Sequence, residues 1–229
     1  MKVEDIKQLY DGAYAASYDA KFLHSELTAA DTRYELKLLE TLLKPGMRWL
    51  DVACGTGYFL RHFPLIERTG TDISPAMLER ARQGNVGVTL REHDYRHRMD
   101  DWIDRFDLVS CMWYAYCYAD TVAEVAQLIE NLASWTAPSG TCFMPLADPD
   151  LITGQTLPYR HASAWPGEVL ITGISWTYVD ENGAKAHKHL VSPNIEFMTE
   201  HFREFFRSVK VIRYPDSNRP ALLATGKRR

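Results

Sequence analysis

The chain has 229 residues, of which 46% are hydrophobic and 24% are charged. This length can bury a substantial core without a second domain, and the composition is that of an ordinary globular protein. The formal net charge of -4 provides no general basic surface for a phosphate backbone, so nucleic acid is not the expected partner. No apolar run approaches the roughly 18 residues that span a bilayer, and the start lacks the apolar stretch of a secretory signal. We therefore expect a cytoplasmic protein with no membrane span.

The first part of the chain predicts two amphipathic helices. One covers about residues 6–18, and the second runs over about 28–43 until Lys44-Pro45-Gly46 ends it. Three tyrosines with four-residue spacing fall on one face of the first helix: Tyr10, Tyr14 and Tyr18. We expect residues 1–43 to form a helical lid ahead of the main sheet.

Strand-like and helix-like segments then alternate along the chain up to residue 146. An apolar run at 47–53 enters a glycine-containing turn and then a helix from Tyr58. The further expected strands are 69–73, 86–90, 106–112 and 141–146, and the further helices begin at Ser74-Pro75 and at Thr121. A turn is expected at Pro138-Ser139-Gly140. This alternation indicates a doubly wound, mainly parallel α/β sheet with helices on both faces.

The remainder of the chain departs from that alternation. Strand-like runs at 167–179 and 184–191 flank Asp180-Glu181-Asn182-Gly183, which signals an inserted β-hairpin. A helix at 194–206 and strands at 208–214 and 221–224 close the chain. We therefore expect a single domain with about seven strands, the last antiparallel. Its parts are the lid 1–43, a core 44–146, a substrate-side insertion 147–192 and closing elements 193–229.

Acidic residues and a glycine loop converge on one edge of the predicted sheet. The loop follows Asp51 at the end of the first strand, while Asp72 and Asp94 follow the second and third strands. Each acid alone is compatible with a helix N-cap or a surface position. A carboxylate after the second strand can accept hydrogen bonds from both hydroxyls of a ribose, and one after the third can accept from an adenine amino group. Together they predict a nucleoside-containing ligand.

Four segments resemble the successive motifs of class I S-adenosylmethionine-dependent methyltransferases: WLDVACGTG, TGTDISPAML, EHDY and FDLVSCMW. The resemblance covers residues 47–146 and implies S-adenosylmethionine as the cofactor. It implies that Gly55 and Gly57 line the methionine part of the cofactor. It also implies that Asp51 helps to hold the amino group of that part, and that Asp72 binds the ribose.

The same resemblance implies an adenine site. Ile73 and Met77 are expected to sandwich the adenine, and Asp94 is expected to accept a hydrogen bond from its amino group. Three further residues of these motifs are assigned to the cofactor: Ala53, Tyr95 and Cys111. The segment 10–19 is similar to the lid helix of small-molecule members of the family, in which a tyrosine closes over the cofactor. Tyr18 is the first candidate and Tyr10 the second, with packing of the tyrosines on the core as the alternative.

An aromatic run after the fourth strand is the expected wall beside the reacting methyl group. Because a sulfonium methyl is already activated, positioning and exclusion of water supply much of the rate. Aromatic faces tolerate the cationic sulfonium, so the acceptor is expected to contact Trp113, Tyr114 and Tyr116. Tyr159, in the aromatic insertion, is expected to join them. Core packing is the alternative for each of these rings.

Histidine is the natural general base if the acceptor is a hydroxyl or a protonated amine. His161, in the insertion, is the candidate. His187 and His189 are expected on one face of the hairpin, where a surface or structural role is favoured. Neither His187-Lys188-His189 nor the His93 and His97 pair has a convincing third ligand, so no metal is expected.

The predicted activity is methyl transfer by in-line displacement to a hydroxyl or amine of a small molecule, such as a sugar, an amine or a natural-product intermediate. Methylation of a quinone-like ring carbon is one alternative, and a cofactor-binding protein that serves a partner without catalysis is another. A nicotinamide-dependent oxidoreductase fits less well, because the loop lacks the third glycine of GxGxxG and because Asp51 and Asp94 would repel a pyrophosphate. A homodimer stays open beside a monomer.

Overall fold

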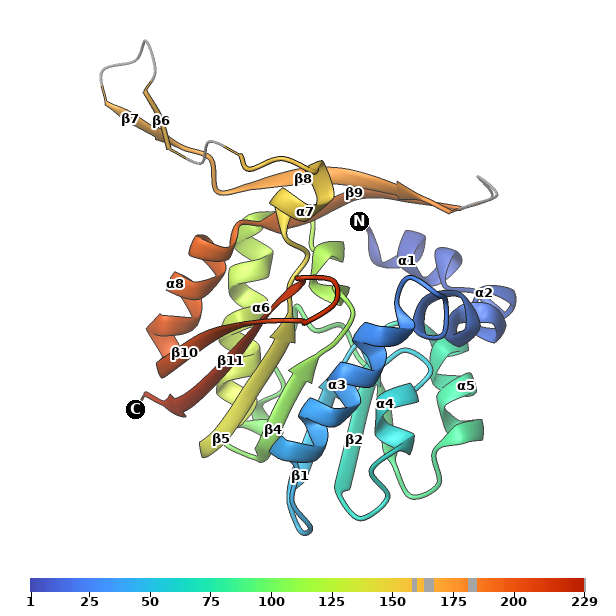
Figure 1. Ribbon diagram of the computed structural model, residues 1–229. Helices are drawn as coiled ribbons and strands as arrows, with labels where there is room; N and C mark the ends of the chain where they lie inside the picture. Colours follow the sequence, from blue (N-terminus) through green and yellow to red (C-terminus); the bar gives the residue numbers. More distant parts are fainter. Residues whose placement is uncertain (158–159, 163–166, 181–184, 229) are drawn as a thin grey trace.

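The expected α/β architecture is confirmed by a computed structural model, which describes residues 1–157, 167–180 and 185–228 and the backbone of 160–162. Seven strands form one sheet in the order β10-β11-β5-β4-β1-β2-β3, and β11 is antiparallel to both of its neighbours (Figure 1). The strands are β1 Arg48–Val52, β2 Glu67–Asp72, β3 Thr89–Glu92, β4 Phe106–Cys111, β5 Thr136–Pro145, β10 Phe206–Arg213 and β11 Pro220–Lys227. The other described pairs in this sheet are parallel, as the alternation of strands and helices predicts.

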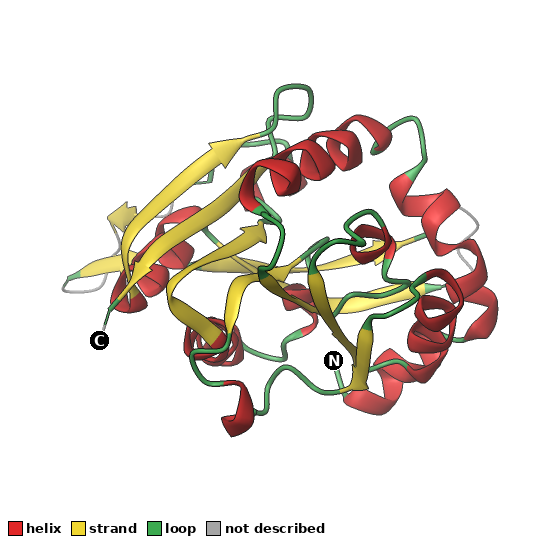
Figure 2. Cartoon of the chain, turned by 90° about the horizontal axis from the view of Figure 1, so that it is seen from below, coloured by secondary structure: helices red, strands yellow, loops and turns green. Residues whose placement is uncertain are grey.

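Helices cover both faces of the sheet (Figures 1 and 2). They are α3 Ala29–Leu42, α4 Tyr58–Arg61, α5 Pro75–Gly84, α6 Val122–Trp135 and α8 Ile195–Phe205. Successive residues of β1 point to opposite faces, so Leu50 packs in the cluster with α6 and α8, whereas Trp49 packs in the cluster with α3 and α4. Two apolar layers thus bury the sheet. None of the described helices has the length and apolar character needed to cross a membrane.

The lid differs from its prediction as one helix over residues 6–18. The structure has α1 Val3–Leu9, α2 Gly12–Tyr18 and a π-helical turn, Asp19–Leu23. The break falls at Asp11, because its side chain accepts a hydrogen bond from the backbone N–H of Tyr14 and so starts a new helix. The three tyrosine rings nevertheless stay together, since Tyr10 lies 5.4 Å from Tyr14 and 6.2 Å from Tyr18 between ring centroids.

Two expected boundaries in the core are also wrong. β3 begins at Thr89 rather than near residue 86. The predicted turn at 138–140 lies inside β5, which starts at Thr136 and shifts register against β4 between Phe106 and Leu108. Gly140 is needed there for close packing, because a Cβ would lie 2.9 Å from the carbonyl oxygen of Phe106.

The insertion forms a hairpin, as expected, and a second small sheet that was not expected. The hairpin pairs β8 Gly173–Val179 with β9 Ala186–Pro193 and crosses above the carboxyl ends of the central strands (Figure 1). The second sheet pairs β6 Arg160–Ala162 with β7 Glu168–Leu170, which splits the predicted strand over 167–179. A short helix, α7 Pro149–Thr153, precedes them. The turn predicted at 180–183 lies outside the described residues apart from Asp180.

Ser74 joins the lid to the sheet. Its hydroxyl caps α5 by accepting from the N–H of Met77, and it donates to the carbonyl oxygen of Tyr10 at 2.7 Å. The Ser74 side chain is fully buried. One hydroxyl therefore satisfies a helix end and a lid carbonyl at once.

Replacing this hydroxyl should cost stability. Ser74→Ala is expected to lower the free energy of unfolding by about 1–2 kcal/mol, because it removes the cap and leaves the Tyr10 carbonyl without its donor. Urea unfolding followed by circular dichroism measures the change. Ser17→Ala on the exposed side of α2 is the control and should change the free energy by less than about 0.5 kcal/mol. Equal effects of the two substitutions would contradict this role.

Two buried acids of α3 hold the connection between β10 and β11. Asp31 forms an ion pair with Arg219 at 3.0 Å and accepts from the hydroxyl of Ser217, while Glu35 accepts from the hydroxyl of Tyr214 at 2.7 Å. Both acids are 2% exposed. Burial raises the pKa of Glu35 to about 8, although the hydrogen bond from Tyr214 acts in the opposite direction. Glu35 is therefore mostly protonated in the folded protein at neutral pH.

The free energy of unfolding should fall as pH rises from about 4.5 to about 8. Between the ordinary glutamate pKa of 4.5 and the folded value of about 8, only the unfolded state releases the proton, so the free energy of unfolding decreases as pH rises. Glu35→Gln removes this contribution, which has a limiting slope of about 1.4 kcal/mol per pH unit. Urea unfolding across this pH range should show a flatter profile for Glu35→Gln than for wild type. Glu40→Gln, an exposed change on the same helix, should keep the wild-type profile; identical profiles for all three proteins would show that Glu35 is not protonated.

Candidate active site

The glycine loop turns tightly between β1 and α4. Ala53, Gly55 and Gly57 have positive φ angles of 55°, 56° and 68°, and the N–H of Cys54 bonds back to Thr71 of β2. At Gly57 a Cβ would lie 2.5 Å from the side chain of Asn85, so glycine is required there by packing as well as by conformation. The loop thus folds its backbone against the end of β2.

Asp72 fastens that loop in place. One of its carboxylate oxygens accepts from the N–H of Gly55, and the other accepts from the N–H of Ser74, each at 2.8 Å. Burial raises the pKa of Asp72 to about 6, against the lowering effect of the backbone hydrogen bonds. The carboxylate stands at the carboxyl end of β2, where it lines a cavity.

This first cavity has a volume of about 680 Å³ and lies between the glycine loop and the lid. It brings together nine of the residues predicted for the site: Tyr10, Tyr18, Ala53, Gly55, Asp72, Ile73, Met77, Tyr95 and Trp113. Its lining combines one carboxylate with apolar and aromatic side chains, as small-molecule sites do.

Four predicted cofactor residues do not line this cavity: Asp51, Gly57, Asp94 and Cys111. Asp51 is 1% exposed and accepts at 2.7 Å from Ser110, whose hydroxyl in turn accepts from the indole N–H of Trp49. Burial raises the pKa of Asp51 to about 7. Cys111 is fully buried on β4. These side chains lie behind the loop and support it from within the sheet.

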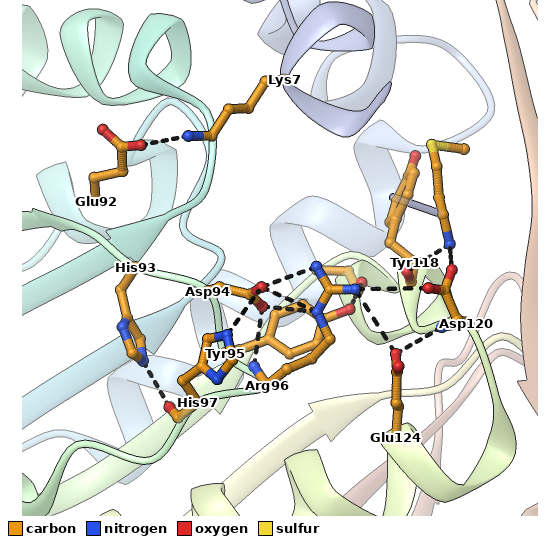
Figure 3. Close-up of polar contacts among 12 residues, drawn as sticks. Lys7, Glu92, His93, Asp94, Tyr95, Arg96, His97, Tyr118, Asp120 and Glu124 are labelled. Atoms are coloured by element: carbon orange, nitrogen blue, oxygen red, sulfur yellow. Dashed lines mark hydrogen bonds and ion pairs between the residues drawn. The ribbon is translucent and has the colours of Figure 1, made fainter. Parts of the chain in front are cut away.

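Asp94 is already engaged by a neighbouring cation (Figure 3). The guanidinium of Arg96 donates to both of its oxygens, at 2.9 and 3.1 Å. Although burial acts to raise it, the hydrogen bonds from Arg96 hold the pKa of Asp94 below its ordinary value. Arg96 also lies 4.0 Å from Asp120 and 3.8 Å from Glu124 at the start of α6. Asp94 is thus paired with a cation and is not among the described residues that line the first cavity.

A second, larger cavity of about 1120 Å³ adjoins the first. Its walls come from four places in the sequence: the lid, the segment after β4, the hairpin and the turn between β10 and β11. The residues that line both cavities are all aromatic: Tyr10, Tyr18, Trp113 and Tyr118. The two spaces therefore meet at an aromatic wall.

The segment after β4 carries much of this wall. Trp113 and Tyr114 have φ angles of 51° and 61°, and a short 3-10 helix, Ala115–Tyr118, follows. Tyr114 lines the second cavity, as predicted. Tyr116 does not: it is fully buried, and its hydroxyl accepts from the N–H of Ala147 at 2.9 Å. The 3-10 turn directs this ring into the core, so the expectation that it contacts the acceptor is corrected.

The histidines are arranged differently from the prediction. The side chain of His161 and the whole of Tyr159 lie outside the described residues, although the backbone of His161 is part of β6. His187 is 2% exposed and lines the second cavity, whereas His189 is exposed. A register shift in β9 and a φ of 58° at His189 break the alternation that would have put both on one face. A bulge of this kind leaves no clear pattern in the sequence.

His187 has two tyrosine partners. Its Nε2 bonds with the hydroxyl of Tyr14 at 2.8 Å, and its Nδ1 bonds with the hydroxyl of Tyr118 at 2.5 Å. Burial, with a smaller contribution from the positive charge of Lys21, lowers the pKa of His187 to about 4. The imidazole is therefore neutral at ordinary pH.

Two cations border the second cavity, and both were missed in the sequence. Lys21 forms an ion pair with Asp180 at 2.9 Å, and Arg219 is held by Asp31 while its guanidinium lies over the ring of Tyr114. No aspartate or glutamate is among the described residues that line this cavity. No group of three potential metal ligands occurs within the described part of the chain.

Comparison with known proteins supports a common chemistry for this site. Residues 50–140 match a family model described as a methyltransferase domain. A dTDP-4-amino-2,3,4,6-tetradeoxy-D-glucose N,N-dimethyltransferase of Saccharopolyspora spinosa is 29% identical over 187 residues, which cover 77% of this chain and 71% of the relative. A dTDP-3-amino-3,4,6-trideoxy-alpha-D-glucopyranose N,N-dimethyltransferase of Streptomyces venezuelae is 29% identical over 58% of this chain and 56% of the relative.

A solved structure confirms the fold over nearly the whole chain. It is that of SAM-bound CalS10, an amino pentose methyltransferase from Micromonospora echinaspora, with a TM-score of 0.60 and 24% identity over 93% of this chain and 96% of that one. The matched domain contains the glycine loop and the strand ends that build the first cavity. Residues 50–140 therefore form a methyltransferase domain, and most of the chain is similar to S-adenosylmethionine-dependent methyltransferases of small molecules.

Proposed function

We propose that this enzyme transfers methyl groups to the amino group of a nucleotide-activated amino sugar. The observation that carries the proposal is the pair of adjoining cavities, which share an aromatic wall formed by Tyr10, Tyr18, Trp113 and Tyr118. The first cavity suits the cofactor and the second suits the acceptor. The names of the two relatives given above supply the acceptor class, since both act on dTDP-activated amino sugars.

The first cavity has the chemistry that S-adenosylmethionine requires. Asp72 is the one carboxylate in its described lining and is assigned to the ribose hydroxyls. Ile73 and Met77 flank the adenine, and Gly55 with Ala53 faces the methionine part. Tyr10 and Tyr18 of the lid cover the site. Since Asp94 is held by Arg96, its proposed role changes from contact with the adenine to positioning of the loop that carries Tyr95.

When bound, the cofactor supplies a methyl group that its positive sulfur has already activated. The chain holds the acceptor nitrogen in line with that group and keeps water out, which is enough to account for much of the acceleration. Tyr18 and Trp113 line both cavities, and their aromatic faces can lie against the positive charge of the cofactor sulfur. No covalent step is assigned to a protein side chain.

The charged side chains at the border of the second cavity favour an acceptor with an anionic group. Lys21 and Arg219 border the cavity, and its described lining has no carboxylate to stabilise an ammonium ion. The same cations suit the diphosphate of a nucleotide-activated sugar. A quinone-like acceptor would not account for these cations at the border of the cavity.

Turnover with defined acceptors tests the proposal. The purified enzyme with S-adenosylmethionine is expected to add one and then a second methyl group to dTDP-3-amino or dTDP-4-amino sugars, as measured by mass spectrometry. The matched control is the dTDP sugar with a hydroxyl in place of the amine, which should not react. Methylation of the hydroxyl sugar alone, or no transfer to any amino sugar by enzyme that binds the cofactor, would overturn the assignment.

The proposed role of Asp72 predicts a pH-dependent affinity for the cofactor product. Only the ionised carboxylate accepts hydrogen bonds from both ribose hydroxyls, and the pKa of Asp72 in the free protein is about 6. The Kd for S-adenosylhomocysteine should therefore rise as pH falls below this value, toward a limit of about tenfold per pH unit. Calorimetric titration between about pH 5 and pH 8 measures the change.

Asp72→Asn provides the matched variant for this titration. It should bind S-adenosylhomocysteine more weakly at pH above 6 and lose the pH dependence, because it has no group to ionise. If the variant keeps the wild-type slope, another acid such as Asp51, with a pKa of about 7, is responsible. If its affinity equals that of wild type at every pH, the ribose lies elsewhere.

A further inference from the structure

A series of hydrogen bonds links the lid, the segment after β4 and the hairpin. The hydroxyl of Tyr10 lies 2.6 Å from that of Tyr118, and Tyr118 bonds with Nδ1 of His187. Nε2 of the same imidazole bonds with Tyr14. Residues 14 and 187 are 173 positions apart, so this series exists only when the lid and the hairpin are packed together.

The series passes through the place where methyl transfer must occur. Tyr10 and Tyr118 line both cavities, His187 lines only the second, and Tyr14 lines neither. The Tyr118 hydroxyl is thus the polar group of the shared wall that His187 contacts directly. Trp113 and Tyr18 contribute the rest of that wall.

The protonation state of His187 limits how these bonds are directed. A neutral imidazole has one N–H and one lone pair, so it donates to one tyrosine and accepts from the other. Burial is the main reason that the pKa of His187 falls to about 4 and the ring is neutral; Lys21 and Lys185 also lower the pKa, and Asp180 acts to raise it. If Nδ1 carries the lone pair, it accepts the O–H of Tyr118, and Nε2–H donates to Tyr14.

The reacting amine needs its lone pair directed at the methyl group and its N–H bonds directed elsewhere. When the hydrogen of Tyr118 is donated to His187, the Tyr118 oxygen presents only lone pairs; one accepts the O–H of Tyr10 at 2.6 Å, and the other can accept an N–H bond. A hydroxyl whose hydrogen is free would instead donate to the amine lone pair and compete with the reaction. The direction of the Tyr118 O–H bond therefore decides whether it helps or hinders attack.

We propose that His187 is a positioning residue: its Nδ1 takes the hydroxyl hydrogen of Tyr118, so that the Tyr118 oxygen holds an N–H of the acceptor amine with the nitrogen lone pair toward the methyl group. This inference rests on the proposed function. The nitrogen lone pair forms the new N–C bond, the electrons of the broken S–C bond pass to sulfur, and the resulting ammonium loses its proton to water. Tyr118 and His187 end the reaction with the protons they began with.

Kinetics of paired substitutions test the coupling. Tyr118→Phe and His187→Phe are each expected to lower kcat about 10- to 100-fold, with a smaller change in the KM of the acceptor. The double variant should lie within about threefold of either single variant, because both remove the same oriented hydroxyl. His189→Asn, an exposed change two positions along the same strand, is the control and should keep wild-type kcat. The Kd for S-adenosylhomocysteine and the melting temperature check that each variant is folded.

Two conservative variants separate positioning from a merely structural link between lid and hairpin. An asparagine amide replaces Nδ1 and reaches Tyr118, whereas a glutamine amide replaces Nε2 and reaches Tyr14. His187→Asn is therefore expected to retain more of kcat than His187→Gln. The opposite order, or full kcat in Tyr118→Phe, would overturn the proposal.

Nitrogen-15 NMR of histidine-labelled protein tests the inference without any acceptor. His187 is identified among the eight histidines by the signals that His187→Asn lacks. We expect His187 to carry its proton on Nε2 and none on Nδ1. A proton on Nδ1 would overturn the proposed direction of the bond with Tyr118. A wild-type enzyme that methylates no amino sugar but shows the expected tautomer would refute the proposed function alone. An active wild type with the other tautomer would refute the positioning role alone.

Discussion

The pair of hydrogen bonds accepted by Asp72 is the interaction on which the rest of the site depends. By taking the N–H groups of Gly55 and Ser74, its carboxylate ties the end of β2 to the loop after β1 and to the start of α5. Ser74 then reaches the carbonyl oxygen of Tyr10 and so attaches the lid. Two successive βα units and the N-terminal helices thus share one buried carboxylate. The first cavity exists because these three pieces cannot separate without exposing unpaired polar groups.

The walls of the two cavities are held in place by different kinds of contact. The first rests on the carboxyl ends of parallel strands, whose spacing and twist fix the positions of the loops. The second is assembled from the lid, the hairpin, the segment after β4 and the turn that carries Arg219. Its walls are therefore held by side-chain contacts between distant segments, such as the ion pairs of Lys21 with Asp180 and of Lys185 with Asp11. A family that keeps the first cavity and changes the second can accept many substrates.

Buried acids set much of the electrostatic character of the protein. Asp51, Asp72 and Glu35 have raised pKa values because burial disfavours their charged forms, while Asp94 is held ionised by Arg96. An acid without a cation costs stability when it ionises, and Asp72 offsets part of this cost by accepting from the N–H groups of Gly55 and Ser74. Asp31, by contrast, forms an ion pair with Arg219 and so holds that cation at the border of the second cavity.

Local patterns were sufficient for the central sheet and the cofactor loop. The continuously buried strands β1 and β4, the capped start of α5 at Ser74 and the amphipathic α6 all follow from short stretches of sequence, and the structure confirms them. The lid was predicted as one helix because its apolar spacing continues through Asp11, which caps α2 instead. Gly140 was taken for a turn because its contact with Phe106 joins segments more than thirty residues apart.

The sequence by itself determined the fold class and the glycine loop with its three acids, because these depend on repeated local spacing along the chain. Only the tertiary structure decided which of those acids line the first cavity: Asp72 does, whereas Asp94 is paired with Arg96 and the buried Asp51 accepts from Ser110. The tertiary structure also decided which residues meet at the second cavity. His187 meets Tyr14 and Tyr118 across 173 and 69 residues, and contacts between such distant positions leave no periodic trace in a single sequence.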